Sequence, residues 1–140
     1  MRTARLTVRS DDILKEVREA QRSLSQLIVA AADRPPKENE VWSLYAVSER
    51  LAAVLKFRLG VERPGVFLEL PRSEKPEEFL PLALDGLQSA VAALEAKDQL
   101  EGLESIRTAR TYLRAYLAQK RRVKMRAKRK ASSSSRPYSA

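Results

Sequence analysis

The chain has 140 residues, of which 44% are hydrophobic, and it carries a formal net charge of +9. This length and apolar content are typical of one small domain with an appended segment. The absence of cysteine and histidine excludes disulfides, zinc–thiolate sites and nucleophiles activated by histidine. We therefore expect a protein that is not an enzyme and that uses neither a metal nor another cofactor.

The first predicted helix covers residues 11–33, where apolar residues recur at spacings of three and four. Ser10 is its expected N-cap. Arg34 ends it, because the residue before a proline is disfavoured in a helix. Its predicted buried positions are Leu14, Val17, Ala20, Leu24, Leu27, Ile28 and Ala31.

The second predicted helix covers residues 38–59 and is followed by Gly60, which suits the left-handed position after a helix. Its predicted buried positions are Val41, Leu44, Tyr45, Ser48, Leu51, Val54, Leu55 and Leu59. Residues 66–70 are expected to form a short strand or an extended apolar strap. Residues 3–8 are the candidate partner of that strand, although two short strands alone are only marginally stable.

The third and fourth predicted helices form a tight antiparallel hairpin. The third runs from Pro76, a residue that suits a first helical turn, to about Ala96. Asp98 is the expected N-cap of the fourth, with an acidic residue three positions later. The buried positions predicted for the third helix are Phe79, Leu80, Ala83, Leu84, Leu87, Val91 and Leu94, and those for the fourth are Leu100, Leu103, Ile106, Ala109, Leu113, Tyr116 and Leu117.

These elements predict an all-α fold, a four-helix antiparallel bundle built from two helical hairpins. The bundle occupies residues 1–118, because apolar periodicity stops at Leu117. Residues 119–140 are predicted to form a basic C-terminal helical extension and a flexible, Ser-rich tail. Gly86 and Gly102 lie inside predicted helices, where each costs about 1 kcal/mol relative to alanine. Either they allow two helices to approach closely or they are incidental.

Positive charge is concentrated at the C-terminal end of the chain. Residues 105–140 contain 12 Lys and Arg and no acidic residue, whereas the preceding 104 residues contain 15 basic and 18 acidic residues. The segment Lys120–Lys130 alone has eight Lys and Arg in eleven residues. Such an array attracts phosphate backbones through counterion release, largely without regard to base sequence. We therefore expect a non-catalytic accessory protein that binds nucleic acid, with RNA or a ribonucleoprotein slightly ahead of DNA.

The candidate nucleic-acid-binding residues fall into two groups. On the predicted bundle, Arg107, Arg110 and Arg114 are expected to orient the ligand. Beyond the bundle, further cations are expected to supply most of the affinity by contacting phosphates. These are Lys120, Arg121, Arg122, Lys124, Arg126, Lys128, Arg129 and Lys130.

Aromatic residues near these cations add a second candidate contact. Tyr112 and Tyr116 lie four residues apart on the same predicted helix. Tyr112 is a candidate for stacking on an unpaired base, whereas Tyr116 adjoins the apolar stripe and is expected in the core. Trp42 and Tyr45 open the second helix, and we interpret Trp42 as a core or interface anchor rather than a platform for a ligand.

The main alternative is a helical scaffold or assembly subunit that binds a protein partner, with a basic tail that only solubilises or targets it. A homodimer through the fourth helix is compatible with this alternative. The apolar seam for such a dimer consists of Leu103, Ile106, Leu113 and Leu117.

A membrane partner is not expected. The longest apolar run, residues 27–32, has six residues, whereas about 20 are needed to cross a bilayer. Residues 1–10 lack the continuous apolar core of a signal peptide. We therefore expect a cytoplasmic protein.

Overall fold

The computed structural model of the protein describes residues 10–60 and 75–135. The predicted all-α fold is confirmed, since no strand occurs within these two ranges. The strands predicted for residues 3–8 and 66–70 lie outside them. The elements are α1 (Ser10–Ala30), α2 (Glu38–Leu59), a short 3₁₀ helix η2 (Pro76–Glu78), α3 (Phe79–Glu95) and α4 (Gln99–Ser135).

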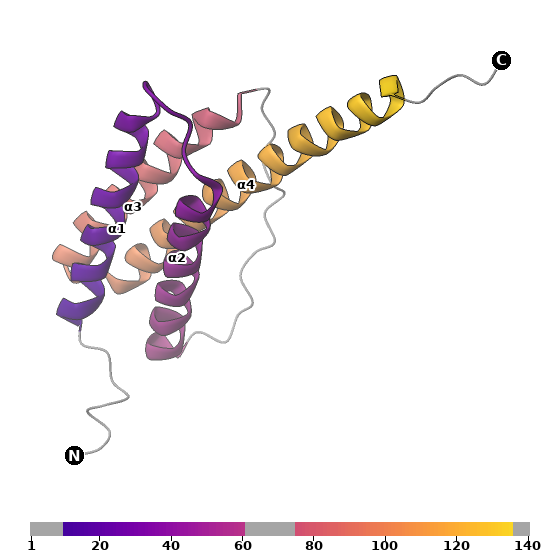
Figure 1. Ribbon diagram of the computed structural model, residues 1–140. Coiled ribbons are helices and arrows are strands. Elements are labelled where there is room, and N and C mark those ends of the chain that lie inside the picture. Colours follow the sequence, from indigo (N-terminus) through magenta and orange to yellow (C-terminus); the bar gives the residue numbers. More distant parts are fainter. Residues whose placement is uncertain (1–9, 61–74, 136–140) are drawn as a thin grey trace.

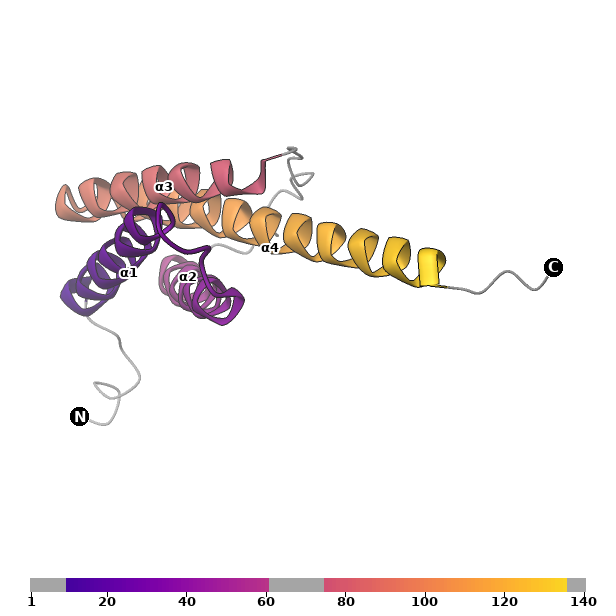
Figure 2. The ribbon, with the colours of Figure 1, turned by 45° about the horizontal axis from the view of Figure 1, so that its top comes forward.

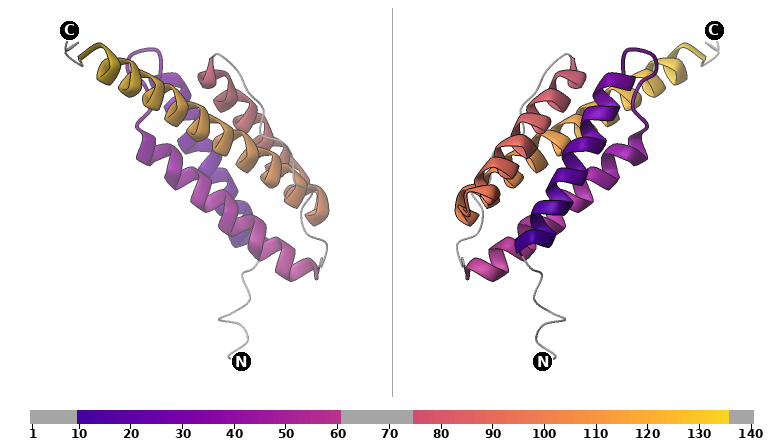
Figure 3. Two further views of the ribbon diagram at one scale, coloured as in Figure 1. Left: turned by 90° about the vertical axis from the view of Figure 1, so that its right-hand side faces the viewer. Right: turned by 90° about the vertical axis from the view of Figure 1, so that its left-hand side faces the viewer.

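The four α-helices pack together, and each contacts two others. The most extensive interface joins α3 to α4, followed by those of α2 with α4 and of α1 with α3. Figure 2 shows α3 lying along the first part of α4. The left panel of Figure 3 shows α4 with α2 on one side and α3 on the other. Residues far apart in the sequence therefore meet on α4, which is the longest element.

The core consists of the apolar stripes of the four helices, largely at the predicted positions. Two predictions for α1 are wrong. Ile13 is buried and Leu14 only partly so. Ala31 is exposed, because α1 ends at Ala30 and not at residue 33 as predicted. The prediction for Leu100 is also wrong: it lies in the first turn of α4, outside the core, and is exposed.

The predicted helix ends are confirmed at two joints. Gly60 follows α2 in the left-handed conformation (φ 65°, ψ 27°), and its backbone N–H donates to the carbonyl oxygens of Lys56 and Phe57. Between α3 and α4, Lys97 has a positive φ of 62°. The carboxylate of Asp98 then accepts a hydrogen bond from the backbone N–H of Glu101 at 3.1 Å, as expected of an N-cap.

Gly86 and Gly102 mark close packing at the α3–α4 interface. A Cβ atom added to Gly86 would lie 2.9 Å from the backbone nitrogen of Ala109 and 3.0 Å from its Cβ. A Cβ added to Gly102 would lie 2.7 Å from the Cδ2 atom of Leu94. Both glycines therefore allow α3 and α4 to approach each other closely, and neither is incidental. At Gly86 the backbones themselves meet, whereas at Gly102 a side chain fills the space.

Ion pairs join neighbouring helices at the surface of the bundle. Arg18 of α1 lies 2.6 Å from Glu95 of α3, and Arg50 of α2 lies 3.1 Å from Glu16 of α1. All four side chains are partly exposed, and pairs of this kind contribute about 0–1 kcal/mol each. They orient the helices more than they stabilise the fold.

Candidate nucleic-acid interface

The C-terminal part of α4 changes from a core element to an exposed one. Its last buried residue is Leu117, and every residue from Arg121 to Ala131 is exposed. The helix nevertheless continues to Ser135, and Figure 1 shows this part running past the ends of the other helices. At about 1.5 Å per residue, the stretch after Leu117 is roughly 27 Å long. The basic residues are therefore displayed on a helix that leaves the bundle.

A groove of about 730 Å³ lies where α4 leaves the bundle beside the start of α2. We call it the arginine groove. Its walls carry five arginines and one lysine but only one carboxylate, so it favours a negatively charged ligand. The lining residues are Glu38 and Trp42 from α2, and Arg114, Leu117, Ala118, Arg121, Arg122, Lys124, Met125, Arg126 and Arg129 from α4.

The sequence builds this groove by a seven-residue repetition along α4. Arg114 precedes Arg121 by seven residues, and Arg122 precedes Arg129 by the same interval. Seven residues make nearly two turns of an α-helix, so the members of each pair lie on one face. A small residue, Ala118, lies between the first pair and keeps the groove open beside Trp42.

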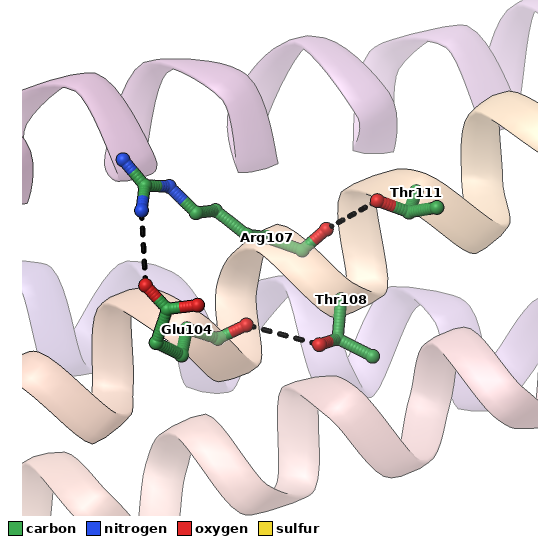
Figure 4. A network of polar contacts seen from close by, with 4 residues as sticks. All are labelled: Glu104, Arg107, Thr108 and Thr111. Carbon is green, nitrogen blue, oxygen red and sulfur yellow. Dashed lines mark hydrogen bonds and ion pairs between the residues drawn. The ribbon is translucent and has the colours of Figure 1, made fainter. Parts of the chain in front are cut away.

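Two of the arginines predicted to bind nucleic acid form ion pairs at the surface of the bundle. The guanidinium of Arg107 lies 2.9 Å from the carboxylate of Glu104, and its side chain is 17% exposed. Figure 4 shows this pair, together with the hydroxyl groups of Thr108 and Thr111, which donate to the backbone carbonyls of Glu104 and Arg107. Arg110 faces α2 and lies 3.8 Å from Glu49, with 29% of its side chain exposed.

Lys120 is also engaged, because it connects α4 to η2. Its Nζ atom lies 2.8 Å from the carboxylate of Glu77 and 5.9 Å from the centre of the Tyr116 ring. The hydrogen bond between the two charged groups lowers the pKa of Glu77 and raises the pKa of Lys120. Both side chains therefore stay ionised at neutral pH, and Lys120 joins α4 to η2 just after the last buried residue of α4.

The seven cations from Arg121 to Lys130 have a different environment. They are all exposed, and within the described part of the chain none of them lies in an ion pair with a carboxylate. Four of the seven line the arginine groove and a fifth, Lys124, lines both this groove and a smaller one beside Pro36. Their charges are thus open to a ligand. The set comprises Arg121, Arg122, Lys124, Arg126, Lys128, Arg129 and Lys130.

The aromatic residues follow the sequence predictions in part. Tyr116 is buried as predicted, and burial raises its pKa. Tyr112, the predicted stacking residue, is partly buried and already stacked on Phe79, with ring centres 6.2 Å apart. Trp42, which we interpreted as a core or interface anchor, is 50% exposed and lines the arginine groove. Its position just off the buried stripe of α2 was the only sequence signal of this role.

The apolar seam considered for a homodimer is not at the surface. Leu103, Ile106 and Leu113 are fully buried, and Leu117 nearly so. All four pack inside the bundle of their own chain. A dimer could therefore use this seam only if the bundle unfolded.

Two structural features are absent from the described residues. They contain no group of three or more acidic side chains that could hold a metal ion. No helix among them is long and apolar enough to cross a membrane. The chain matches no family model, no curated protein and no solved structure.

Proposed function

We propose that this chain is a non-catalytic accessory protein that binds the phosphate backbone of nucleic acid through α4. In this proposal an antiparallel bundle of two helical hairpins carries a basic helical extension, and the ligand lies along the arginine groove and the exposed cations beyond it. One observation carries the proposal. Seven cations between Arg121 and Lys130 are exposed and lie outside every ion pair found in the described residues.

Electrostatics favours a polyanion over a single small anion. The cations from Arg114 to Lys130 are spread over roughly 24 Å of helix and match a ligand with repeated charges. Each phosphate neutralised by Lys or Arg releases a counterion, and the guanidinium group of arginine binds phosphate oxygens in a bidentate manner. With about 5 to 8 phosphates engaged, log K should fall with log[salt] at a slope on the order of −4 to −7.

The structure changes the division of roles that we expected from the sequence. Arg110 and Lys120 join α4 to α2 and η2 through their carboxylate partners, and Arg107 pairs with Glu104 of α4 itself. Arg114 lies in the groove and is the bundle residue best placed to orient the ligand. The remaining affinity then comes from the cations after Lys120.

A four-residue charge variant in the full-length chain tests the proposal. Arg121, Arg122, Arg126 and Arg129 are each replaced by glutamine, and binding to RNA and DNA is measured by fluorescence anisotropy over a range of salt. The control variant removes four cations elsewhere, at Lys15, Arg22, Lys56 and Lys97, and therefore has the same net charge. Circular dichroism shows whether each variant keeps its helices.

The groove variant should lose affinity by at least about tenfold, and its salt slope should become shallower by roughly 3 to 4. The control should lose much less, because its cations lie on other parts of the surface. Equal losses in the two variants would show that only net charge matters and that α4 is not the binding element. Unchanged binding in the groove variant, or no binding by the natural chain, would favour the scaffold alternative.

A further inference from the structure

Trp42 is an aromatic residue placed among cations. It lies in the first part of α2, and half of its side chain is exposed. Its ring packs edge-on against Tyr45, with centres 5.6 Å apart and planes at 88°. Tryptophan is usually well buried, because its large apolar surface is costly to expose. Here the exposed half borders the arginine groove.

Arginines of α4 lie close to this aromatic pair. Arg114 and Arg121 line the groove together with Trp42, and Arg110 approaches from the neighbouring turn of α4. The charges of Arg114 and Arg110 also act on the hydroxyl of Tyr45, where they oppose the increase in pKa caused by burial and by Glu49. An aromatic surface bordered by guanidinium groups is suited to a ligand that is flat and apolar on its faces and anionic along its edge.

We propose that the arginine groove binds an unpaired strand of nucleic acid, with one base stacked on Trp42 and the flanking phosphates held by Arg114 and Arg121. This inference rests on the proposed function and specifies the class of nucleic acid. Only an unpaired strand has bases whose faces are free for a side chain, because in a duplex they are stacked on one another. The groove volume of about 730 Å³ lies within the range typical of ligand sites.

Tyr112 is less suited to this role. Its ring is stacked on Phe79 and packs against the core, and it is not one of the residues that line the groove. A protein partner that uses Trp42 as an anchor is the competing occupant. The single carboxylate of the groove, Glu38, against six cations makes an anionic strand the better match.

Trp42 is also the only tryptophan in the chain, so its fluorescence reports on this groove alone. The full-length protein is titrated with oligouridylate RNA, with oligothymidylate DNA of the same length, and with a duplex that has the same number of phosphates. Affinities are measured in parallel by anisotropy for the natural chain and for Trp42→Ala and Trp42→Phe. The control is Phe57→Ala, which removes an exposed aromatic residue (90% exposed) from the other end of α2.

We expect the single strands to quench the fluorescence of Trp42 and the duplex to quench it little. Trp42→Ala should weaken single-strand binding by about 5- to 100-fold and duplex binding by less than about twofold. Trp42→Phe should restore most of the loss, and Phe57→Ala should bind as the natural chain does. Quenching by either strand supports the inference, and the better-bound strand identifies the preferred sugar.

Two results would overturn the inference while leaving the proposed function intact. One is equal weakening of single-strand and duplex binding by Trp42→Ala. The other is unchanged single-strand binding by that variant, combined with lost binding in the variant that lacks four groove arginines. If the natural chain binds none of the three nucleic acids, the proposed function fails as well, and Trp42 is assigned to a protein interface.

Discussion

Truncation after Gln119 separates the bundle from the basic part of α4. Every buried residue of the described chain precedes this point, since Leu117 is the last of them. The fold loses the ion pair of Lys120 with Glu77 and the contact of Lys120 with the Tyr116 ring. Both charged side chains are partly exposed, so screening limits the ion pair to about 0–1 kcal/mol, and the ring contact adds about 0.5–1 kcal/mol.

Removal of the tail also relieves repulsion among like charges, which offsets part of this loss. We therefore expect the free energy of unfolding to change by less than about 1.5 kcal/mol. For a domain of this size the midpoint of thermal unfolding should then shift by less than roughly 10 °C. The circular dichroism of the truncated chain should remain helical, and its melt should remain cooperative.

Binding should change far more than stability. The deleted segment carries nine of the 12 cations that follow Glu104, and the truncated chain has as many acidic as basic residues. Of the predicted binding residues only Arg107, Arg110 and Arg114 remain, and two of these are held in ion pairs. Affinity for nucleic acid should therefore fall by at least about 100-fold at moderate salt.

The assay combines thermal melts with anisotropy titrations of one RNA and one duplex DNA at two salt concentrations. An unfolded truncated chain would show that residues after Gln119 belong to the core or to a subunit interface. A folded truncated chain with unchanged affinity would show that the basic part of α4 does not bind nucleic acid. Either result contradicts the separation of roles along α4.

Three further predictions concern packing and ion pairing. Tyr116→Ala should lower the free energy of unfolding by about 3–5 kcal/mol in urea denaturation, because this side chain is fully buried, and a loss below about 1 kcal/mol would contradict its place in the core. Gly86→Ala should lower the free energy of unfolding by about 1–3 kcal/mol, because the backbone of α4 must move to make room for the new Cβ. Gly102→Ala meets only the flexible end of a side chain and should leave the stability nearly unchanged. Equal effects of the two substitutions would contradict this difference. Glu77→Gln should lower stability by up to about 1 kcal/mol at neutral pH. Lys120 lowers the folded-state pKa of Glu77. The difference in stability between the natural chain and Glu77→Gln should therefore be fully present above the ordinary pKa of 4.5 and should disappear as the pH falls through the lowered pKa. Melts of the two proteins that differ equally at all acidic pH values would refute this pH dependence.

The helices could be predicted from the sequence because the signals that define them are local. The bounds predicted for α2 agree with those observed, Glu38–Leu59, since a proline-rich entry and Gly60 limit the helix at both ends. The start of α4 also followed from a local signal, the capping carboxylate of Asp98. The error at Ile13 and Leu14 has a physical reason. Both residues are aliphatic neighbours at the start of a helix, where only the packing of other helices selects the buried one.

The candidate site was less predictable, because the partners of its cations lie on other elements. Glu49 and Glu77 engage Arg110 and Lys120 across distances of more than 40 residues in the sequence. No local pattern reveals such pairs. The pair of Arg107 with Glu104, three residues apart, was visible in the sequence as a spacing that favours contact on a helix. The role of Trp42 required the position of α4 relative to α2 and could not be predicted from either helix alone.

The charge of the exposed part of α4 links the order of this segment to its ligand. Cations four residues apart, such as Arg122 with Arg126 and Lys124 with Lys128, repel each other on a helix and cost about 0.2–0.5 kcal/mol per pair. Glu38 is the single carboxylate that lines the arginine groove and offsets little of this repulsion, so the backbone hydrogen bonds of the helix must oppose most of it. A bound phosphate backbone removes the repulsion and therefore favours the helix that presents the cations. Salt also screens the repulsion, but unlike the ligand it weakens the binding of the phosphate backbone. Addition of ligand should therefore increase the helix content of α4. Addition of salt should also increase its helix content but should lower its affinity for nucleic acid.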